Sequence, residues 1–229
     1  MKHSAESMNV MAAVVTLGSF AACGQAQVLL NISDGFGSGS FNAWSSVVTV
    51  EAQSGTFLSS GGNPGTYASL IATTSPNNRT GTGFQFRGAG STIVLGSLDS
   101  QISLGADLRR TSVVSTGTPI PQFVPFLVQS NRIYQPASFI AGPETALWTT
   151  VAPVRFNVSE FTNSSGIPLN PAASVTVGFW LRYNPHPGVP AGPSYGVGVD
   201  NLTLTVIPAP GAIGVGLAGL MLLGRRRRV

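Results

Sequence analysis

Hydrophobic and polar residues alternate with a period of two through most of residues 27–206. The clearest run is SVTVGFWLRY (residues 174–183), whose other face, opposite the hydrophobic stripe, carries Trp180 and Arg182. The run QISLGADLR (residues 101–109) alternates in the same way. Such alternation predicts strands of an antiparallel sheet that covers a hydrophobic core with one face.

Clusters of turn-forming residues separate these runs. Segments such as SDGFGSGS, SSGGNPGTY and NPHPGVPAGPS are rich in Gly and Pro, which supply the backbone angles that tight turns need. We expect about ten strands and find no convincing amphipathic helix. The pattern therefore predicts an all-β fold, a single antiparallel β-sandwich of the jelly-roll type, over residues 27–206.

The charge of the chain lies at its ends. The formal net charge is +4, yet residues 27–207 contain seven arginines and seven acidic residues. The basic excess comes from Lys2 and from four terminal arginines, Arg225, Arg226, Arg227 and Arg228. Because the body is neutral, its net charge does not favour binding to nucleic acid.

The N-terminus is typical of an export signal. Residues 10–22 (VMAAVVTLGSFAA) are apolar, long enough for the core of a signal peptide and too short to cross a bilayer. We predict a signal peptide over residues 1–26, cleaved after Ala26, which would also remove the single cysteine, Cys23. A buried core helix is the alternative, and a lipoprotein attached at Cys23 is a weaker one.

Residue types that support catalysis are scarce. His186 is the only histidine of the body, so a catalytic triad or a zinc cluster lacks the necessary residues. Paired carboxylates can hydrolyse glycosides, but the seven acidic residues show no paired motif, and Asp99 and Asp107 are expected at solvated strand edges. We therefore predict no catalytic residue and no enzyme, with a glycan-active enzyme as the least favoured alternative.

The chain ends in three parts: Pro208-Ala209-Pro210, an apolar run over residues 211–224, and the four arginines. As a helix, the apolar run would extend about 21 Å, less than the ~30 Å hydrocarbon core of a bilayer. Arginines after an apolar stretch favour the cytoplasmic side. We expect a single hydrophobic helix and a transient or stable membrane association.

This tripartite end, residues 207–229, resembles the PEP-CTERM sorting domain. The resemblance implies export through the translocon, recognition and processing by an exosortase, and delivery to the cell surface or extracellular matrix. The sorting residues would be Pro208, Ala209 and Pro210 together with the arginine cluster. The family has glutamate where this chain has Ala209, so cleavage is less firmly implied than sorting.

Three stretches of the body carry a second resemblance: SSGGNPGTYASL (59–70), ISLGADLRR (102–110) and YGVGVDNLTLTV (195–206). They resemble secreted jelly-roll domains of the carbohydrate-binding-module and laminin-B-like kind, which have a GGNPGGY-like turn and an Asp-Asn pair in the last strand. The resemblance implies a structural calcium ion held by Asp200 with Asp34 or Glu51, and oxygen ligands suit calcium. The alternative is that Asp200 only hydrogen-bonds to the backbone.

Aromatic residues are the candidates for carbohydrate binding, because sugar rings stack on aromatic faces. Trp180 and its neighbour Arg182 lie opposite the hydrophobic stripe of their strand, and Trp148 is a further candidate, as are Trp44, Tyr134 and Tyr195. The alternative for Trp180 is a second buried layer that covers both faces of the strand.

These features predict an exported, non-enzymatic protein of the cell surface or extracellular matrix, with a β-sandwich joined to a sorting tail. The alternative is a secreted carbohydrate-binding module whose partner is an extracellular polysaccharide.

Overall fold

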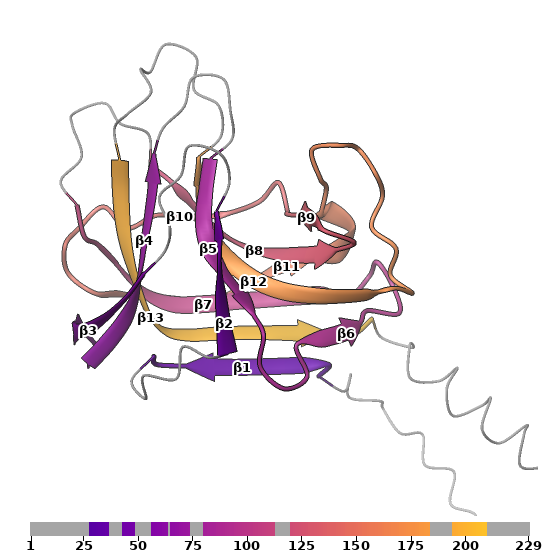
Figure 1. The fold of residues 1–229 in the computed structure, drawn as a ribbon, viewed down its shortest axis with the longest axis horizontal. Helices are drawn as coiled ribbons and strands as arrows, with labels where there is room; N and C mark the ends of the chain where they lie inside the picture. The colour runs from indigo at the N-terminus through magenta and orange to yellow at the C-terminus, as the bar shows by residue number, and fades with distance from the viewer. Residues whose placement is uncertain are drawn as a thin grey trace, which may run out of the picture.

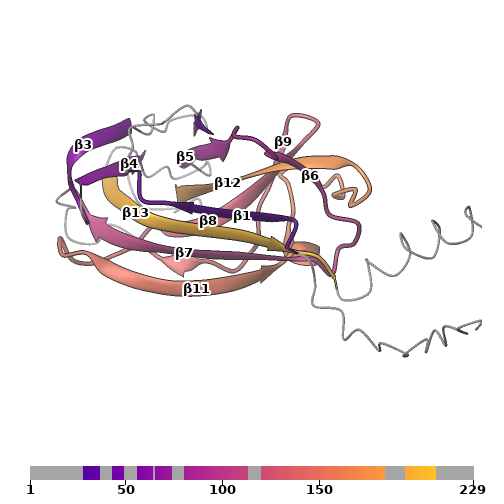
Figure 2. The ribbon, with the colours of Figure 1, turned by 90° about the horizontal axis from the view of Figure 1, so that it is seen from below.

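The computed structural model describes seven stretches of the chain: residues 28–36, 43–48, 56–63, 65–73, 80–112, 120–183 and 194–209. They form two antiparallel β-sheets packed face to face, with one short 3-10 helix over Val158–Glu160 (Figures 1 and 2). The predicted all-β antiparallel sandwich is confirmed. The predicted signal peptide, Glu51 and the tail beyond Ala209 lie outside the described residues.

Sheet A, as described, has six strands. Its strands lie in the order β11 (Thr149–Asn157), β7 (Gln101–Arg110), β13 (Ser194–Ile207), β4 (Gly65–Thr73) and β3 (Thr56–Gly62), and β1 (Leu30–Asp34) also pairs with β13. β13 therefore has β7 on one side, and on the other side first β4 and then β1.

Sheet B, over the same described residues, has seven strands. Its strands lie in the order β10 (Ile140–Ala141), β8 (Gln122–Gln129), β12 (Ser174–Tyr183), β5 (Thr80–Phe86) and β2 (Trp44–Val48), with β6 (Thr92–Val94) on β12 and β9 (Arg132–Tyr134) on β8.

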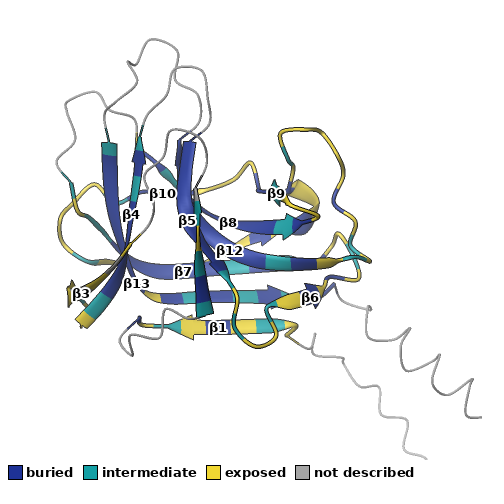
Figure 3. Cartoon of the chain, in the orientation of Figure 1, coloured by how far each residue is buried: buried dark blue, intermediate teal, exposed yellow. Residues whose placement is uncertain are grey.

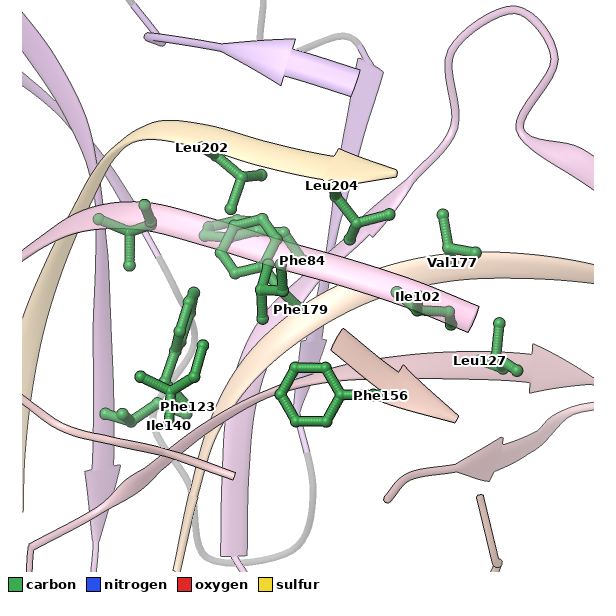
Figure 4. Close-up of a cluster of buried hydrophobic side chains, with 14 of the residues drawn as sticks. Phe84, Ile102, Phe123, Leu127, Ile140, Phe156, Val177, Phe179, Leu202 and Leu204 are labelled. Carbon is green, nitrogen blue, oxygen red and sulfur yellow. The ribbon is translucent and has the colours of Figure 1, made fainter. Parts of the chain in front are cut away.

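The hydrophobic core fills the space between the two sheets (Figure 3). Phe179 of β12 lies near its centre, with its ring centroid 5.9 Å from that of Phe84 and 5.8 Å from that of Phe123 (Figure 4). Leu202 and Leu204 of β13 face the same space from sheet A and are fully buried. Burying a large apolar side chain stabilises the fold by about 1.5–3 kcal/mol, so the period-two pattern of the sequence supplies most of the driving force.

One irregularity of sheet A determines where polar groups gather. The register of β13 against β7 shifts between Asp200 and Thr203, because β13 contains one extra residue there. Asn201 takes a φ of 45°, in the left-handed region that asparagine tolerates better than most residues. The β-bulge keeps Val199 and Leu202 both in the core, while Asp200 and Asn201 are directed away from it.

Candidate ligand site on the outer face of sheet A

A glycine-rich turn at the end of β3 folds against the bulge of β13. Gly61 and Gly65 have φ values of 89° and 96°, which favour glycine. Gly62 is required for a different reason, since a Cβ there would lie 2.8 Å from Oδ2 of Asp200 and 2.6 Å from the carbonyl oxygen of Thr66. The turn can therefore approach Asp200 only because Gly62 lacks a side chain.

Four residues of the turn and the two neighbouring strands form an amide–carboxylate network: Asn63, Asp107, Asp200 and Asn201. The carboxylate of Asp200, fully buried, accepts hydrogen bonds from the backbone N–H groups of Asn63 and Asn201, the latter at 2.8 Å. The side-chain amide of Asn201 donates to the carbonyl oxygen of Asn63 and to Oδ2 of Asp107, each at 2.7 Å. The side-chain amide of Asn63 also donates to Oδ2 of Asp107, at 3.2 Å.

The network holds two like charges next to each other. Asp107 of β7 pairs directly with Asp200 of β13, an arrangement that by itself destabilises a sheet. Burial by itself would raise the pKa of the Asp107 carboxyl. Side-chain hydrogen bonds from Asn201, Thr150 and Asn63 outweigh burial and bring this pKa below the usual value of an aspartate. Asp107 is therefore ionised at neutral pH.

An aromatic–arginine stack, formed by Tyr67, Arg109 and Trp148, lies beside the network on the same face. The guanidinium carbon of Arg109 is 4.7 Å from the ring centroid of Tyr67 and 4.7 Å from that of Trp148. The two rings meet edge to face, with centroids 5.6 Å apart and an interplanar angle of 81°. Tyr67 is buried, whereas Arg109 and Trp148 are half-buried, so solvent reaches the stack at the indole and the guanidinium.

The backbone beneath the stack explains how closely these side chains approach the sheet. Gly198 of β13 pairs with Arg109 of β7. A Cβ on Gly198 would lie 3.0 Å from the Tyr67 ring and 3.1 Å from the Trp148 ring. The indole N–H of Trp148 donates to the carbonyl oxygen of Gly61 at 3.3 Å, which joins the stack to the glycine-rich turn.

No protein-family model matches the sequence, and no curated protein is similar to it. Two solved structures are similar in fold. One, from a cellulosomal cellulase of Clostridium thermocellum, is 18% identical, with a TM-score of 0.44, and the match covers 79% of this chain and 95% of that one. The other, from the same organism in complex with a β-1,3-1,4-mixed-linked tetrasaccharide, is 17% identical, with a TM-score of 0.45 and coverage of 78% and 96%.

Both are family 11 carbohydrate-binding modules. The likeness concerns the general arrangement of the strands. At these identities and TM-scores it carries no information about the ligand or the binding residues of this chain.

Trp180 lies on the outer face of sheet B, away from Trp148. Only 2% of its surface is exposed, and its ring packs on Gly81 and on Phe126, whose ring centroid is 5.3 Å away. With Val124 and Phe126 it forms a second, smaller hydrophobic cluster. The structure therefore favours the buried-layer alternative, and Trp180 has no open face for a sugar ring.

Arg182 is also 2% exposed, and its position is structural. Its Nε donates to Oε1 of Gln122 at 2.7 Å, and its Nη1 donates to Oε1 of Gln135 at 2.8 Å. Its Nη2 donates to the carbonyl oxygen of Ala137 at 3.4 Å. Of the three predicted carbohydrate-binding residues, Trp148 alone is joined to the polar cluster described above.

Among the described residues, the predicted calcium ligands Asp34 and Asp200 each have hydrogen-bond donors of their own. Asp34 accepts hydrogen bonds from the backbone N–H of Phe36 at 2.7 Å and from the indole N–H of Trp44 at 2.9 Å, so it closes a turn. The described residues contain no group of three or more metal-ligating side chains. Calcium takes six to eight oxygen ligands, and both carboxylates of the network instead accept N–H donors, so these residues fit the ion poorly. Binding that involves Glu51 stays a prediction.

Sequence reasoning did not identify Tyr67, Arg109, Asn63 or Asn201 individually, and it assigned Asp107 to a solvated face. Asp107 is in fact 6% exposed, because the glycine-rich turn covers it. The sequence did contain part of the evidence for this site. The stretch with the GGN turn (59–70) and the stretch with the Asp-Asn pair (195–206) are in contact in the structure. The other aromatic candidates, Trp44, Tyr134 and Tyr195, are buried. Among the described residues, no helix is long and apolar enough to cross a membrane.

Proposed function

We propose that this protein is an exported, non-enzymatic carbohydrate-binding protein whose glycan site is the aromatic–arginine stack together with the surface of the amide–carboxylate network. The observation that carries the proposal is the position of Trp148. Its indole is half-buried, is held by a hydrogen bond to the backbone at Gly61, and is backed by Arg109 and Tyr67. A fixed indole at a surface offers the apolar face on which the C–H groups of a pyranose stack.

The carboxylates of the site support binding rather than glycoside hydrolysis. A glycosidase needs one carboxyl whose pKa is raised, so that it can donate a proton to the leaving group. The pKa of Asp107 is lowered, and both oxygens of its neighbour Asp200 accept backbone N–H groups. This pair is therefore unsuited to act as the general acid of a hydrolase.

The destination of the protein is proposed from the terminal segments. A signal peptide before Gln27 and a sorting tail over residues 207–229 support delivery to the cell surface or extracellular matrix through an exosortase. Mass spectrometry of the native protein tests this proposal, with an N-terminus at Gln27 as the expected result. An intact chain from Met1 to Val229 in the cytosol would overturn it.

Glycan-array screening of the mature protein, followed by calorimetric titration, tests the binding proposal. Replacing Trp148 by alanine is expected to weaken glycan binding by roughly tenfold or more, since stacking of this kind is worth about 1 kcal/mol beyond the buried area. Phe139→Ala is the matched control, because Phe139 is an aromatic residue that is 49% exposed away from the site. Absence of any bound glycan, or equal binding by both variants, would refute the proposal, and turnover of a polysaccharide would replace it with an enzymatic function.

A further inference from the structure

The guanidinium of Arg109 has hydrogen-bonding capacity that the described protein does not use. The contacts that the structure gives it are the two aromatic rings of Tyr67 and Trp148. Its Nε is buried and has no acceptor among the described residues. A guanidinium carries five N–H donors. Because the Nε is enclosed, an acceptor from solvent would meet the N–H donors of the two terminal nitrogens, which belong to a half-buried side chain and have no acceptor among the described residues.

The nearby acceptors are already engaged. Asp200 accepts two backbone N–H groups, and Asp107 accepts the side-chain amides of Asn63 and Asn201. What the site still offers to a ligand is therefore an aromatic surface at Trp148 and a set of donors at Arg109. A ligand that matches both needs an apolar ring face and, next to it, a group with at least two acceptor oxygens.

We propose that the ligand class of this site is an acidic polysaccharide, in which the carboxylate of a uronic acid accepts a bidentate hydrogen bond from Arg109 while its pyranose ring stacks on Trp148. The inference rests on the proposed glycan-binding function and names its ligand. A planar carboxylate matches the guanidinium fork in geometry and in charge, whereas a neutral sugar offers only separate hydroxyl groups. Contact with the rings of Tyr67 and Trp148 restricts the movement of the guanidinium before the ligand arrives.

The two aspartates do not cancel this preference. Asp200 is fully buried and Asp107 is 6% exposed, so both carboxylates face the glycine-rich turn and not the surface. The amide donors that they accept stabilise the ionised carboxylates without neutralising them, so it is the enclosure of the carboxylates that limits their repulsion of an anionic ligand. The half-buried Arg109 is the charged group of this cluster that extends toward solvent.

A matched pair of ligands tests the proposal on the mature protein. Oligogalacturonate and the same oligosaccharide after reduction of its carboxyl groups differ only in the charged group. We expect the reduced form to bind at least tenfold more weakly, and we expect binding of the acidic form to weaken as salt is added. Oligoglucuronate with its reduced counterpart serves as a second pair.

Variants of Arg109 give an independent measurement. Arg109→Gln is expected to lose tenfold or more in affinity for the acidic ligand, and Arg109→Lys is expected to lose an intermediate amount, because it keeps the charge without the fork. Arg155→Gln is the control, since Arg155 is an exposed arginine of the same sheet that pairs with Ser103, away from the stack. It should bind within twofold of the unchanged protein.

The outcomes separate the inference from the function on which it rests. Equal binding of the acidic and reduced oligosaccharides, with loss on Trp148→Ala, would overturn the acidic class and leave glycan binding intact. Failure to bind any glycan would overturn both. If Arg109→Gln does not fold, the two ligand pairs on the unchanged protein still decide the question.

Discussion

The side-chain amide of Asn201 donates a hydrogen bond to the carbonyl oxygen of Asn63, 2.7 Å away in space and 138 positions away in sequence. The bond joins the last strand of the sandwich to the turn after β3. The same amide also reaches Asp107 of β7, so one asparagine connects three separate segments of the chain. Asn201 is therefore the residue through which the turn, β7 and β13 are held together at the candidate site.

Asn201→Ala is expected to lower the free energy of unfolding by about 2–3 kcal/mol, because it removes one hydrogen bond to the buried carboxylate of Asp107 and one to the carbonyl oxygen of Asn63, and it leaves alanine in the left-handed region. Asn201→Gly removes the same hydrogen bonds, but glycine adopts the positive φ without strain. It should therefore lower the free energy of unfolding by a smaller amount. Urea titration of both variants measures the difference. Equal stability of the two variants would show that the φ of 45° contributes nothing.

Gly62→Ala is expected to disrupt the site more than Gly65→Ala does. At Gly62 the added Cβ would meet backbone oxygen at 2.6 Å, so the turn must move away from Asp200. At Gly65 nothing lies within 4 Å, and only the φ of 96° is unfavourable, which costs roughly 1 kcal/mol. Thermal unfolding and glycan titration compare the two variants. The expectation fails if Gly65→Ala is the more damaging change in both measurements.

The carboxyl of Asp107 is expected to contribute to acid sensitivity. Its pKa in the folded protein lies below that of an unfolded aspartate, near 3.9, so the folded state binds its proton less tightly. Its stabilising contribution is present above about pH 4 and is lost as the pH falls through the folded pKa. Unfolding free energies measured from pH 7 to pH 2 should therefore decline less steeply in Asp107→Asn than in the unchanged protein. If the free energy of unfolding falls equally steeply with pH in both proteins, the pKa of Asp107 is not lowered.

Trp180→Ala is expected to lower the stability of the fold, whereas Trp148→Ala is expected to lower the affinity for glycan. Trp180 fills a buried position between β5 and β8, so its removal should destabilise the fold by about 3–5 kcal/mol. Binding by the fraction that stays folded should remain unchanged. Trp148→Ala should reduce binding with a small loss of stability. Calorimetric scanning and glycan titration of both variants check this, and loss of affinity in folded Trp180→Ala would place the ligand on sheet B instead.

Removal of calcium is expected to leave the melting temperature unchanged. The carboxylates of Asp107 and Asp200 are satisfied by amide donors, so the network does not require a cation. Differential scanning calorimetry with excess EDTA, and then with excess calcium, tests this. A melting temperature that falls with EDTA and returns with calcium would establish a structural calcium site at these residues or with Glu51.

The alternation of side chains was sufficient to predict the sandwich and its inner faces, because a strand that covers a core must place every second residue in it. The residues of β12 from Val175 to Tyr183 follow this rule. The same rule could not tell whether Trp180 on the opposite face is covered, since coverage depends on elements distant in the sequence. Trp180 is covered because Phe126 of β8 and Gly81 of β5 leave a flat space in which the indole packs.

The candidate site was predictable only in its parts. The glycine-rich turn and the Asp-Asn pair were recognised, but their meeting depends on the register of β13 with β4 and β7 and on the extra residue in β13. Pairing between strands this far apart in sequence leaves no local pattern. Tyr67, Arg109 and Trp148 come from three such strands or their ends, so their stacking could be found only in three dimensions.

The bulge of β13 also has a consequence for how the turn after β3 reaches this face of the sheet. Pairing with β4 ends at Val199 and pairing with β1 begins at Leu202, so on this side of β13 Asp200 and Asn201 have no strand partner among the described residues. The turn at Asn63 occupies that interval with its own backbone. The turn therefore takes the place of a strand over this interval, and the position of the Trp148 indole that it holds depends on a break in the ladder of β13 rather than on the ladder itself.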